Sequence, residues 1–136
     1  MKVRGYVSSR DFMGHNIPQQ VQNMAIRDYC LKNNLEYHLS EVEYSMKGSF
    51  FSINGLIQDI QAMKGIVFYS IFQLPENETM RLKILTKSKK KNIILFFAIE
   101  SMVCKTQSDI KEIDELIRLK LTLKNPNLVW PYKIDE

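Results

Sequence analysis

The stretch that decides the fold is Arg4-Gly5-Tyr6-Val7-Ser8-Ser9-Arg10. An apolar run reaches two hydroxyl-bearing residues and an arginine here, and Pro18 follows a short loop. Proline suits the first turn of a helix, because its missing N–H is not needed there. In α/β folds, a strand that ends in small polar residues ahead of a helix brings polar groups to a binding site. We therefore predict that Lys2–Val7 is the first strand of an α/β domain.

The rest of the chain alternates predicted strands with predicted helices. Further strands are predicted at Leu35–Val42, Ile66–Ser70 and Ile93–Ile99, and helices at about Pro18–Leu31, Ser52–Met63, Glu78–Lys90 and Gln107–Leu123. The third and fourth strands are continuously apolar, which is typical of strands covered on both faces. This order predicts a three-layer α/β sandwich with a four-stranded parallel sheet, in the order 2-1-3-4, and a long C-terminal helix. We expect a single domain over residues 1–124 and a tail over residues 125–136.

Two helices carry patterns that can be compared with a structure. The first should present an apolar face made of Val21, Met24, Ala25 and Tyr29. The last has Ser108, Asp109 and Glu112 near its start, which favours a helix N-terminus there. The third ends in a lysine cluster at positions 87, 89, 90 and 91. Lysines in a last turn offset the partial negative charge of the exposed carbonyls, so we favour a solvated helix end over a nucleic-acid surface for this cluster.

The composition of the chain limits the classes of protein to which it can belong. The chain has 136 residues, 45% of them hydrophobic and 25% charged, with a net charge of +4. We expect no signal peptide and no membrane span, because no apolar segment approaches roughly 20 residues. Cys30 and Cys104 fit no metal spacing, and a bridge between them is not needed, so a reduced cytoplasmic setting is expected. His15 and His38 lack the further ligands that zinc requires. Without a glycine-rich dinucleotide loop we expect neither a nicotinamide cofactor nor any other.

The candidate site lies where the predicted strands end. Ligands in such sheets bind outside the carboxyl ends of the strands. The first strand supplies Ser8, Ser9 and Arg10, and the next helix begins with Gln19 and Gln20. The later strands supply Glu43, Tyr44, Ser70 and Glu100.

These residue types favour an anionic ligand that also carries hydroxyl groups. Hydroxyls, an arginine and a helix start can hold an anion. The glutamates and Ser8 are the catalytic candidates, as acid, base or hydroxyl-binding groups. The structural alternative stays open for each residue, because serines often cap turns and Tyr44 often packs.

Several segments are similar to those of a small bacterial family. The matching segments are Arg4–Arg10, Pro18-Gln-Gln-Val-Gln-Asn23, Ile26-Arg-Asp-Tyr-Cys30, Leu39-Ser-Glu-Val-Glu-Tyr44, Gly65-Ile-Val-Phe-Tyr-Ser70 with Leu74-Pro75, and Phe97-Ala-Ile-Glu100. In these segments the chain resembles the sporadic carbohydrate cluster protein family, which occurs beside genes for surface-carbohydrate biosynthesis. This resemblance implies a pathway and not a reaction.

Gly5-Tyr6, the glutamine-rich helix and the strand pattern also resemble, more remotely, the catalytic domain of resolvase-type serine recombinases. This second resemblance implies a resolvase-like, Rossmann-like fold. That family places an arginine, a spacer and the nucleophilic serine after Gly-Tyr-Ala, whereas this chain reads Ser8, Ser9 and Arg10. The arginine motif that follows the family's third strand meets Phe72-Gln-Leu-Pro-Glu76, which contains no arginine. DNA cleavage needs several positive groups around the scissile phosphate, so its chemistry is not implied.

Three functions follow as expectations. The first is an enzyme or ligand-binding protein of surface-carbohydrate biosynthesis that takes a phosphorylated, nucleotide-linked or acidic sugar. The alternative is a non-catalytic interaction module, which docks on a pathway enzyme or forms a homodimer through its C-terminal helix. A recombinase or DNA-binding protein is the least expected.

Overall fold

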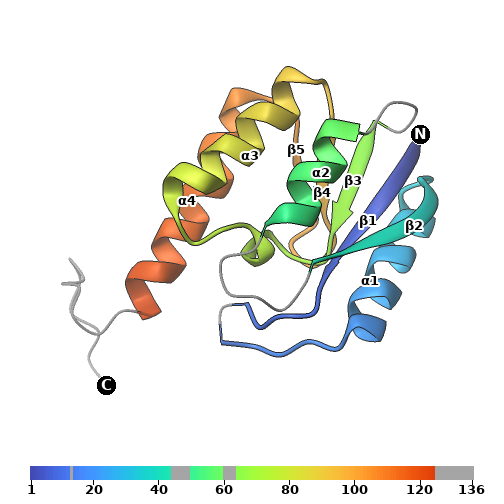
Figure 1. Cartoon of the computed structure of the whole chain (residues 1–136), viewed down its shortest axis with the longest axis horizontal. Helices are drawn as coiled ribbons and strands as arrows, with labels where there is room; N and C mark the ends of the chain where they lie inside the picture. The colour runs from blue at the N-terminus through green and yellow to red at the C-terminus, as the bar shows by residue number, and fades with distance from the viewer. Residues whose placement is uncertain (13, 44–49, 60–63, 125–136) are drawn as a thin grey trace.

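A five-stranded sheet forms the centre of the computed structural model, which describes residues 1–12, 14–43, 50–59 and 64–124 (Figure 1). Its strands are β1 (Lys2–Ser8), β2 (Glu36–Glu43), β3 (Gly65–Phe68), β4 (Ile94–Phe97) and β5 (Met102–Cys104). The spatial order is β2-β1-β3-β4-β5, and the first four strands are parallel. The predicted order 2-1-3-4 is therefore confirmed. The predicted tail, residues 125–136, lies outside the described residues.

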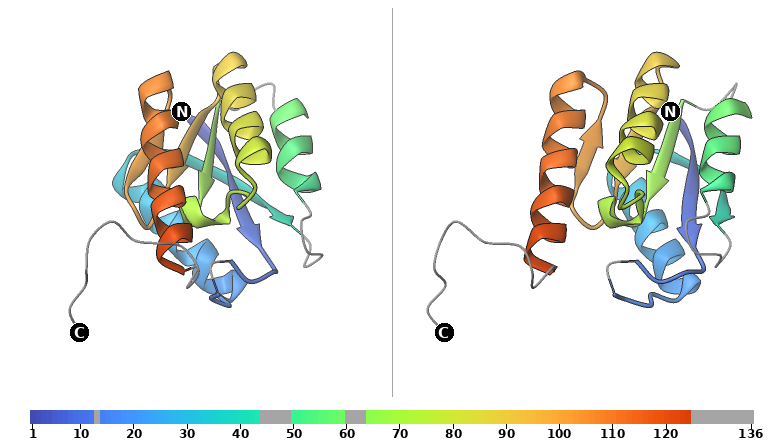
Figure 2. Two further views of the ribbon diagram at one scale, coloured as in Figure 1. Left: turned by 90° about the vertical axis from the view of Figure 1, so that its left-hand side faces the viewer. Right: turned by 60° about the vertical axis from the view of Figure 1, so that its left-hand side comes forward.

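Helices cover both faces of this sheet (Figure 2). They are α1 (Gln19–Lys32), α2 (Phe51–Asp59), α3 (Glu78–Lys90) and α4 (Gln107–Lys124), with a 3-10 turn η1 (Ile71–Gln73). Strand alternation divides β1 between two cores, because Val3 and Val7 pack with α1 while Tyr6 packs on the face that carries α2, α3 and α4. The three-layer α/β class is thus confirmed, with α1 on one face and the other three described helices opposite it.

The prediction of four strands was wrong by one. Met102–Cys104 forms a fifth strand, antiparallel to β4, with Leu95 opposite Cys104 and Phe97 opposite Met102. The predicted fourth strand also ends at Phe97 and not at Ile99, because the chain turns back there. Three residues are too few to show an alternating pattern, so the sequence offered no signal for β5.

The predicted apolar face of α1 was also only partly right. Ala25 and Tyr29 are half-buried, but Val21 and Met24 are exposed. The buried face is made of Gln22, Ile26 and Cys30. A glutamine occupies a core position here because its amide binds the backbone of β1, as described below, and pattern reading counts only apolar side chains.

Gly5 lies at an irregularity between the first two strands. The pairing slips between Arg4 and Gly5, which face His38 and Ser40, so Leu39 is an extra residue on β2. A Cβ atom on residue 5 would overlap the side chain of Ser40. Glycine is therefore required by the close approach of the second strand, and not by an unusual backbone angle.

The lysine cluster lies at the C-terminal end of α3, at the edge of the sheet opposite Arg10 (Figure 1). Lys91 donates from Nζ to the carbonyls of Ile57 (3.3 Å) and Gln58 (3.1 Å), near the end of α2. Lys89 donates to the side-chain oxygen of Gln107 at 3.4 Å. At least two of the four lysines thus bind polar groups of neighbouring helices.

A buried ion pair ties α3 to α4. Arg81, 1% exposed, donates to Asp114 from Nε (2.9 Å) and Nη2 (2.6 Å), and its Nη1 donates to the carbonyls of Pro75 and Glu76. These contacts fix the segment that follows η1. The start of α4 is capped by Thr106 and Asp109, which exchange hydrogen bonds of 3.0 and 3.1 Å. The predicted start of this helix at Gln107 is therefore confirmed, and Thr106 caps it.

Both cysteines are free and buried. Cys30, on α1, belongs to the core on one face of the sheet, whereas Cys104, on β5, belongs to the core on the other face. The sheet separates the two thiols, so they do not form a bridge. None of the described helices is both long and apolar enough to cross a membrane.

Candidate functional site

The end of β1 is held by two buried glutamines. Gln22, on α1, accepts from the N–H of Ser8 (2.9 Å) and donates to its carbonyl (2.8 Å). Gln73, in η1, donates to the Ser8 hydroxyl (3.0 Å) and to the side-chain oxygen of Gln22 (3.1 Å). All three residues are at most 1% exposed. Ser8, predicted as catalytic, thus lies in a closed polar network that fixes the corner where the strand ends.

A second group of contacts lies just beyond the ends of β3 and β4. Ser70 donates from Oγ to Glu100 Oε2 at 2.6 Å, and Glu100 Oε1 accepts from the N–H of Ile71 at 2.9 Å. The Ser70 hydroxyl also accepts from the N–H of Phe72, and the Gln73 side chain accepts from the N–H of Ser70. These reciprocal bonds form a capping box at the start of η1. The structure therefore brings Ser70 and Glu100 together, and Glu100 remains partly exposed.

Glu43 lies fully buried at the start of α2. Its Oε2 accepts from the N–H of Ser52 at 2.8 Å, and its Oε1 accepts from the N–H of Ile53 at 3.3 Å. The Tyr6 hydroxyl donates to the same Oε1 at 2.9 Å. A carboxylate is stabilised at a helix N-terminus by the free N–H groups and the helix dipole. Glu43 therefore occupies the anion position of α2 itself.

The environment of Tyr6 keeps its hydroxyl protonated. Burial raises the pKa of Tyr6 well above its usual value, and the charge of Glu43 and the hydrogen bond to it raise it further. The charge of Arg10 and a hydrogen bond with the Ser8 side chain act in the opposite direction. Tyr6 thus joins the contacts of Glu43 to those of Ser8, and at neutral pH it serves as a hydrogen-bond donor.

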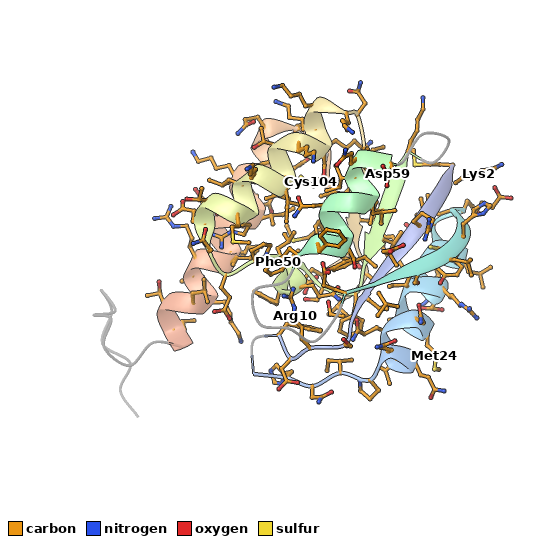
Figure 3. All side chains as sticks on the ribbon, viewed as in Figure 1. Lys2, Arg10, Met24, Phe50, Asp59 and Cys104 are labelled. Atoms are coloured by element: carbon orange, nitrogen blue, oxygen red, sulfur yellow. The ribbon has the colours of Figure 1, made fainter. Side chains whose placement is uncertain are left out.

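Arg10 and Ser9 form the outer part of the site. The Arg10 guanidinium carbon lies 3.9 Å from the centroid of the Phe50 ring, and Nη2 donates to the carbonyl of Gln73 at 3.2 Å. Ser9 is exposed, and its hydroxyl donates to the carbonyl of Glu43 at 2.8 Å. Figure 3 shows Arg10 beside Phe50, at the edge opposite Lys2 and Asp59. A positive charge is therefore fixed by an aromatic ring and a carbonyl at the predicted edge of the sheet.

Three predicted site residues remain, and the structure describes two of them, Gln19 and Gln20. Gln19 and Gln20 are exposed in the first turn of α1, at the same end as Arg10 but outside the buried network. Tyr44 lies outside the described residues. Within the part of the chain that the structure describes, His, Cys, Asp and Glu side chains form no group of three that could hold a metal ion.

Three residues at this edge were missed by the sequence analysis as site residues: Tyr6, Gln22 and Phe50. Gln22 and Gln73 are 51 positions apart in the chain, and their contact appears only in the folded structure. A signal was available for Gln22, because α1 repeats glutamine at positions 19, 20 and 22 while its apolar residues are few.

Solved structures that align with this chain include catalytic domains of site-specific recombinases. The N-terminal catalytic domain of TP901-1 integrase aligns with a TM-score of 0.69 at 15% identity, covering 92% of this chain and 100% of that chain. A resolvase family site-specific recombinase from Streptococcus pneumoniae aligns with a TM-score of 0.66 at 14% identity, covering 91% of this chain and 92% of that chain. No family model and no curated protein sequence matches this chain. At these identities the likeness concerns the fold, so the chain has a resolvase-like α/β fold.

Proposed function

We propose that this chain is a cytoplasmic protein of surface-carbohydrate biosynthesis that binds an anionic sugar derivative at the carboxyl edge of its sheet. The ligand is a phosphorylated, nucleotide-linked or acidic sugar. The observation that carries this proposal is Arg10, held at 3.9 Å over Phe50 and at 3.2 Å from the Gln73 carbonyl. A guanidinium positioned in advance loses little side-chain freedom when it binds an anion.

The two glutamates take different parts in this proposal. Glu43 is 0% exposed and its carboxylate binds two N–H groups of α2 and the Tyr6 hydroxyl, so we assign it to holding the site together. Glu100 is partly exposed, and one of its oxygens lies 2.6 Å from the Ser70 hydroxyl. If the protein is an enzyme, Glu100 is the acid or base that solvent and ligand can reach.

The test is a thermal-melt screen of the full chain against nucleotide sugars, sugar phosphates, acidic sugars and duplex DNA. A ligand at about a hundred times its dissociation constant adds roughly 2.7 kcal/mol to stability, which shifts the melt by several degrees. We expect a shift with one sugar-linked class and its loss in Arg10→Ala. Arg27→Ala is the matched control, because Arg27 also lies over an aromatic ring, 5.2 Å from the Tyr37 centroid. If the ligand shifts the melting temperature of Arg10→Ala as much as that of Arg27→Ala, Arg10 is not part of the binding site. If no sugar class shifts the melting temperature of the wild type, the proposal is rejected.

A homodimer or docking module is the second candidate, favoured by exposed leucines on α4. Leu116, Leu119 and Leu123 are 39%, 42% and 54% exposed, and they share one side of the helix by their spacing. Ile110, Ile113 and Ile117 cover the core instead. Light scattering on the full chain and on Leu119→Glu tests this: a dimer that the substitution converts to monomer supports it, and a wild-type monomer at all concentrations rejects the dimer.

DNA cleavage receives no support from the site. The structural neighbours are recombinase domains, but their likeness to this chain concerns the fold. Ser8 is 1% exposed and its hydroxyl accepts from Gln73, so it is not presented to a phosphate. We keep nucleic acid as the least expected partner, and the duplex DNA in the screen above serves as its test.

A further inference from the structure

Phe51, the first residue of α2, is 81% exposed, more than any other large apolar residue in the described part of the chain. One exposed apolar side chain is ordinary on a protein surface, so exposure by itself assigns no role. Two further observations distinguish Phe51. The backbone around it is held by buried hydrogen bonds, and the ring of the preceding residue, Phe50, stacks with Arg10.

The first turn of α2 is fixed by the end of β2. Glu43 accepts from the N–H groups of Ser52 and Ile53, and the Ser52 hydroxyl donates to the carbonyl of Val42 at 3.0 Å. Phe50, immediately before the helix, packs against the core, while Phe51 faces outward. The exposed ring therefore extends from backbone that is hydrogen-bonded directly to the strand edge of the candidate site.

The placement of Arg10 and Phe51 beside Phe50 suggests a ligand with two recognisable parts. The guanidinium of Arg10 lies over the Phe50 ring, and Phe51 follows Phe50 directly in the chain as the first residue of α2. A charged group on Arg10 and a flat group on Phe51 would thus belong to neighbouring parts of one molecule. In nucleotides, a phosphate and an aromatic base are joined through one sugar, which matches this pairing of an arginine with an exposed ring.

We propose that the ligand of this site is a nucleotide, with its phosphates on Arg10 and its base stacked on Phe51. The inference rests on the proposed function and narrows its three ligand classes to the nucleotide-linked one. Bases stack on aromatic side chains with little dependence on sequence, because every base has a π face. A sugar phosphate or an acidic sugar without a base would leave Phe51 unused.

The experiment compares probes with and without a base. Titration calorimetry on the full chain measures the affinity of UDP, CDP, GDP and ADP beside that of inorganic pyrophosphate. The variants are Phe51→Ala, Phe51→Trp and Arg10→Ala. Leu31→Ala is the control, because Leu31 is 80% exposed on a different helix.

We expect Phe51→Ala to lower the affinity of the best nucleotide about tenfold, within the range of stacking effects, and to leave pyrophosphate unchanged. Phe51→Trp should retain the nucleotide affinity, Arg10→Ala should lower both, and Leu31→Ala should change neither. If Phe51→Ala lowers the affinity for the nucleotide and for pyrophosphate equally, or lowers neither, the base-stacking role is rejected while the Arg10 site stands. If the wild type binds pyrophosphate but gains nothing from a base, the inference fails alone. If it binds no probe, or if Arg10→Ala changes nothing, the proposed function fails with it.

Discussion

The hydroxyl of Tyr6 donates a 2.9 Å hydrogen bond to the buried carboxylate of Glu43. This bond joins the middle of β1 to the start of α2, because the same carboxylate accepts from the N–H groups of Ser52 and Ile53. The carboxyl edge of the sheet is thus built around an internal anion, and the positive charge of Arg10 lies close enough to influence the pKa of Tyr6.

Removing the Tyr6 hydroxyl should destabilise the fold. A hydrogen bond to a charged, buried group contributes about 1.5–3 kcal/mol, so Tyr6→Phe should lower the free energy of unfolding by about that amount. Urea unfolding at pH 7 measures it. Tyr69→Phe is the control, since Tyr69 is a half-buried tyrosine on the α1 face of the sheet. Equal losses in the two variants would contradict a specific role for the bond to Glu43.

The same residue makes a prediction for alkaline pH. The folded protein holds the pKa of Tyr6 above its usual value of 10, chiefly by burial and then by Glu43. The unfolded chain releases this proton near pH 10 while the folded chain retains it, so stability is unaffected below pH 10 and falls above it. One such group changes the free energy of unfolding by about 1.4 kcal/mol per pH unit. Between pH 10 and 11, stability should fall less steeply in Tyr6→Phe than in the wild type, and parallel slopes would contradict the assignment.

Gln22 should be sensitive to apolar replacement although it faces the core. In Gln22→Leu the Ser8 N–H and carbonyl, the Ile17 carbonyl and the Gln73 amide each lose a partner. Leaving buried polar groups unsatisfied costs about 1–3 kcal/mol each, so this variant should lose at least about 3 kcal/mol. Urea unfolding tests this against Gln20→Leu, which alters an exposed glutamine of the same helix. A Gln22→Leu protein as stable as its control would show that the network does not hold the corner.

Both thiols should be unreactive in the folded protein. Burial raises the pKa of Cys30 to about 11 and that of Cys104 to about 12, with a further increase at Cys104 from the charge of Asp109. Since the thiolate is the reactive form, Ellman's reagent at pH 8 should modify neither cysteine until urea unfolds the chain. Rapid modification of one equivalent without denaturant would contradict the burial described for that residue.

Much of the fold could be predicted from the sequence because its signals are local. The apolar run at residues 66–68 and the isoleucines of α4 indicated buried elements directly. The helix Glu78–Lys90 has the predicted bounds, since Asn77 caps its start and lysines end it. The helix predicted to reach Met63 is described only to Asp59.

The inner contacts of the site could not be predicted because they join distant residues. Glu43 was expected as a catalytic group from its position after a strand, but its oxygens bind a helix start nine and ten positions later. Likewise, nothing in the local sequence of Gln73 indicates that its amide would bind Ser8. Because strand ends converge at one edge, we correctly expected Ser70, Glu100 and Arg10 at the same edge of the sheet. It could not show which polar groups bind each other and which face a ligand.

The measurement that tests the central claim most directly is the dissociation constant of an anionic sugar ligand for the wild type and for Arg10→Ala. Both proteins must first be shown to be folded. Loss of a charge-assisted contact should weaken binding by about 10- to 150-fold, which corresponds to about 1.5–3 kcal/mol. Arg27→Ala, which removes the other ring-stacked arginine, should bind like the wild type. If Arg10→Ala binds the ligand as tightly as the wild type, the carboxyl edge of the sheet is not where this protein recognises an anion.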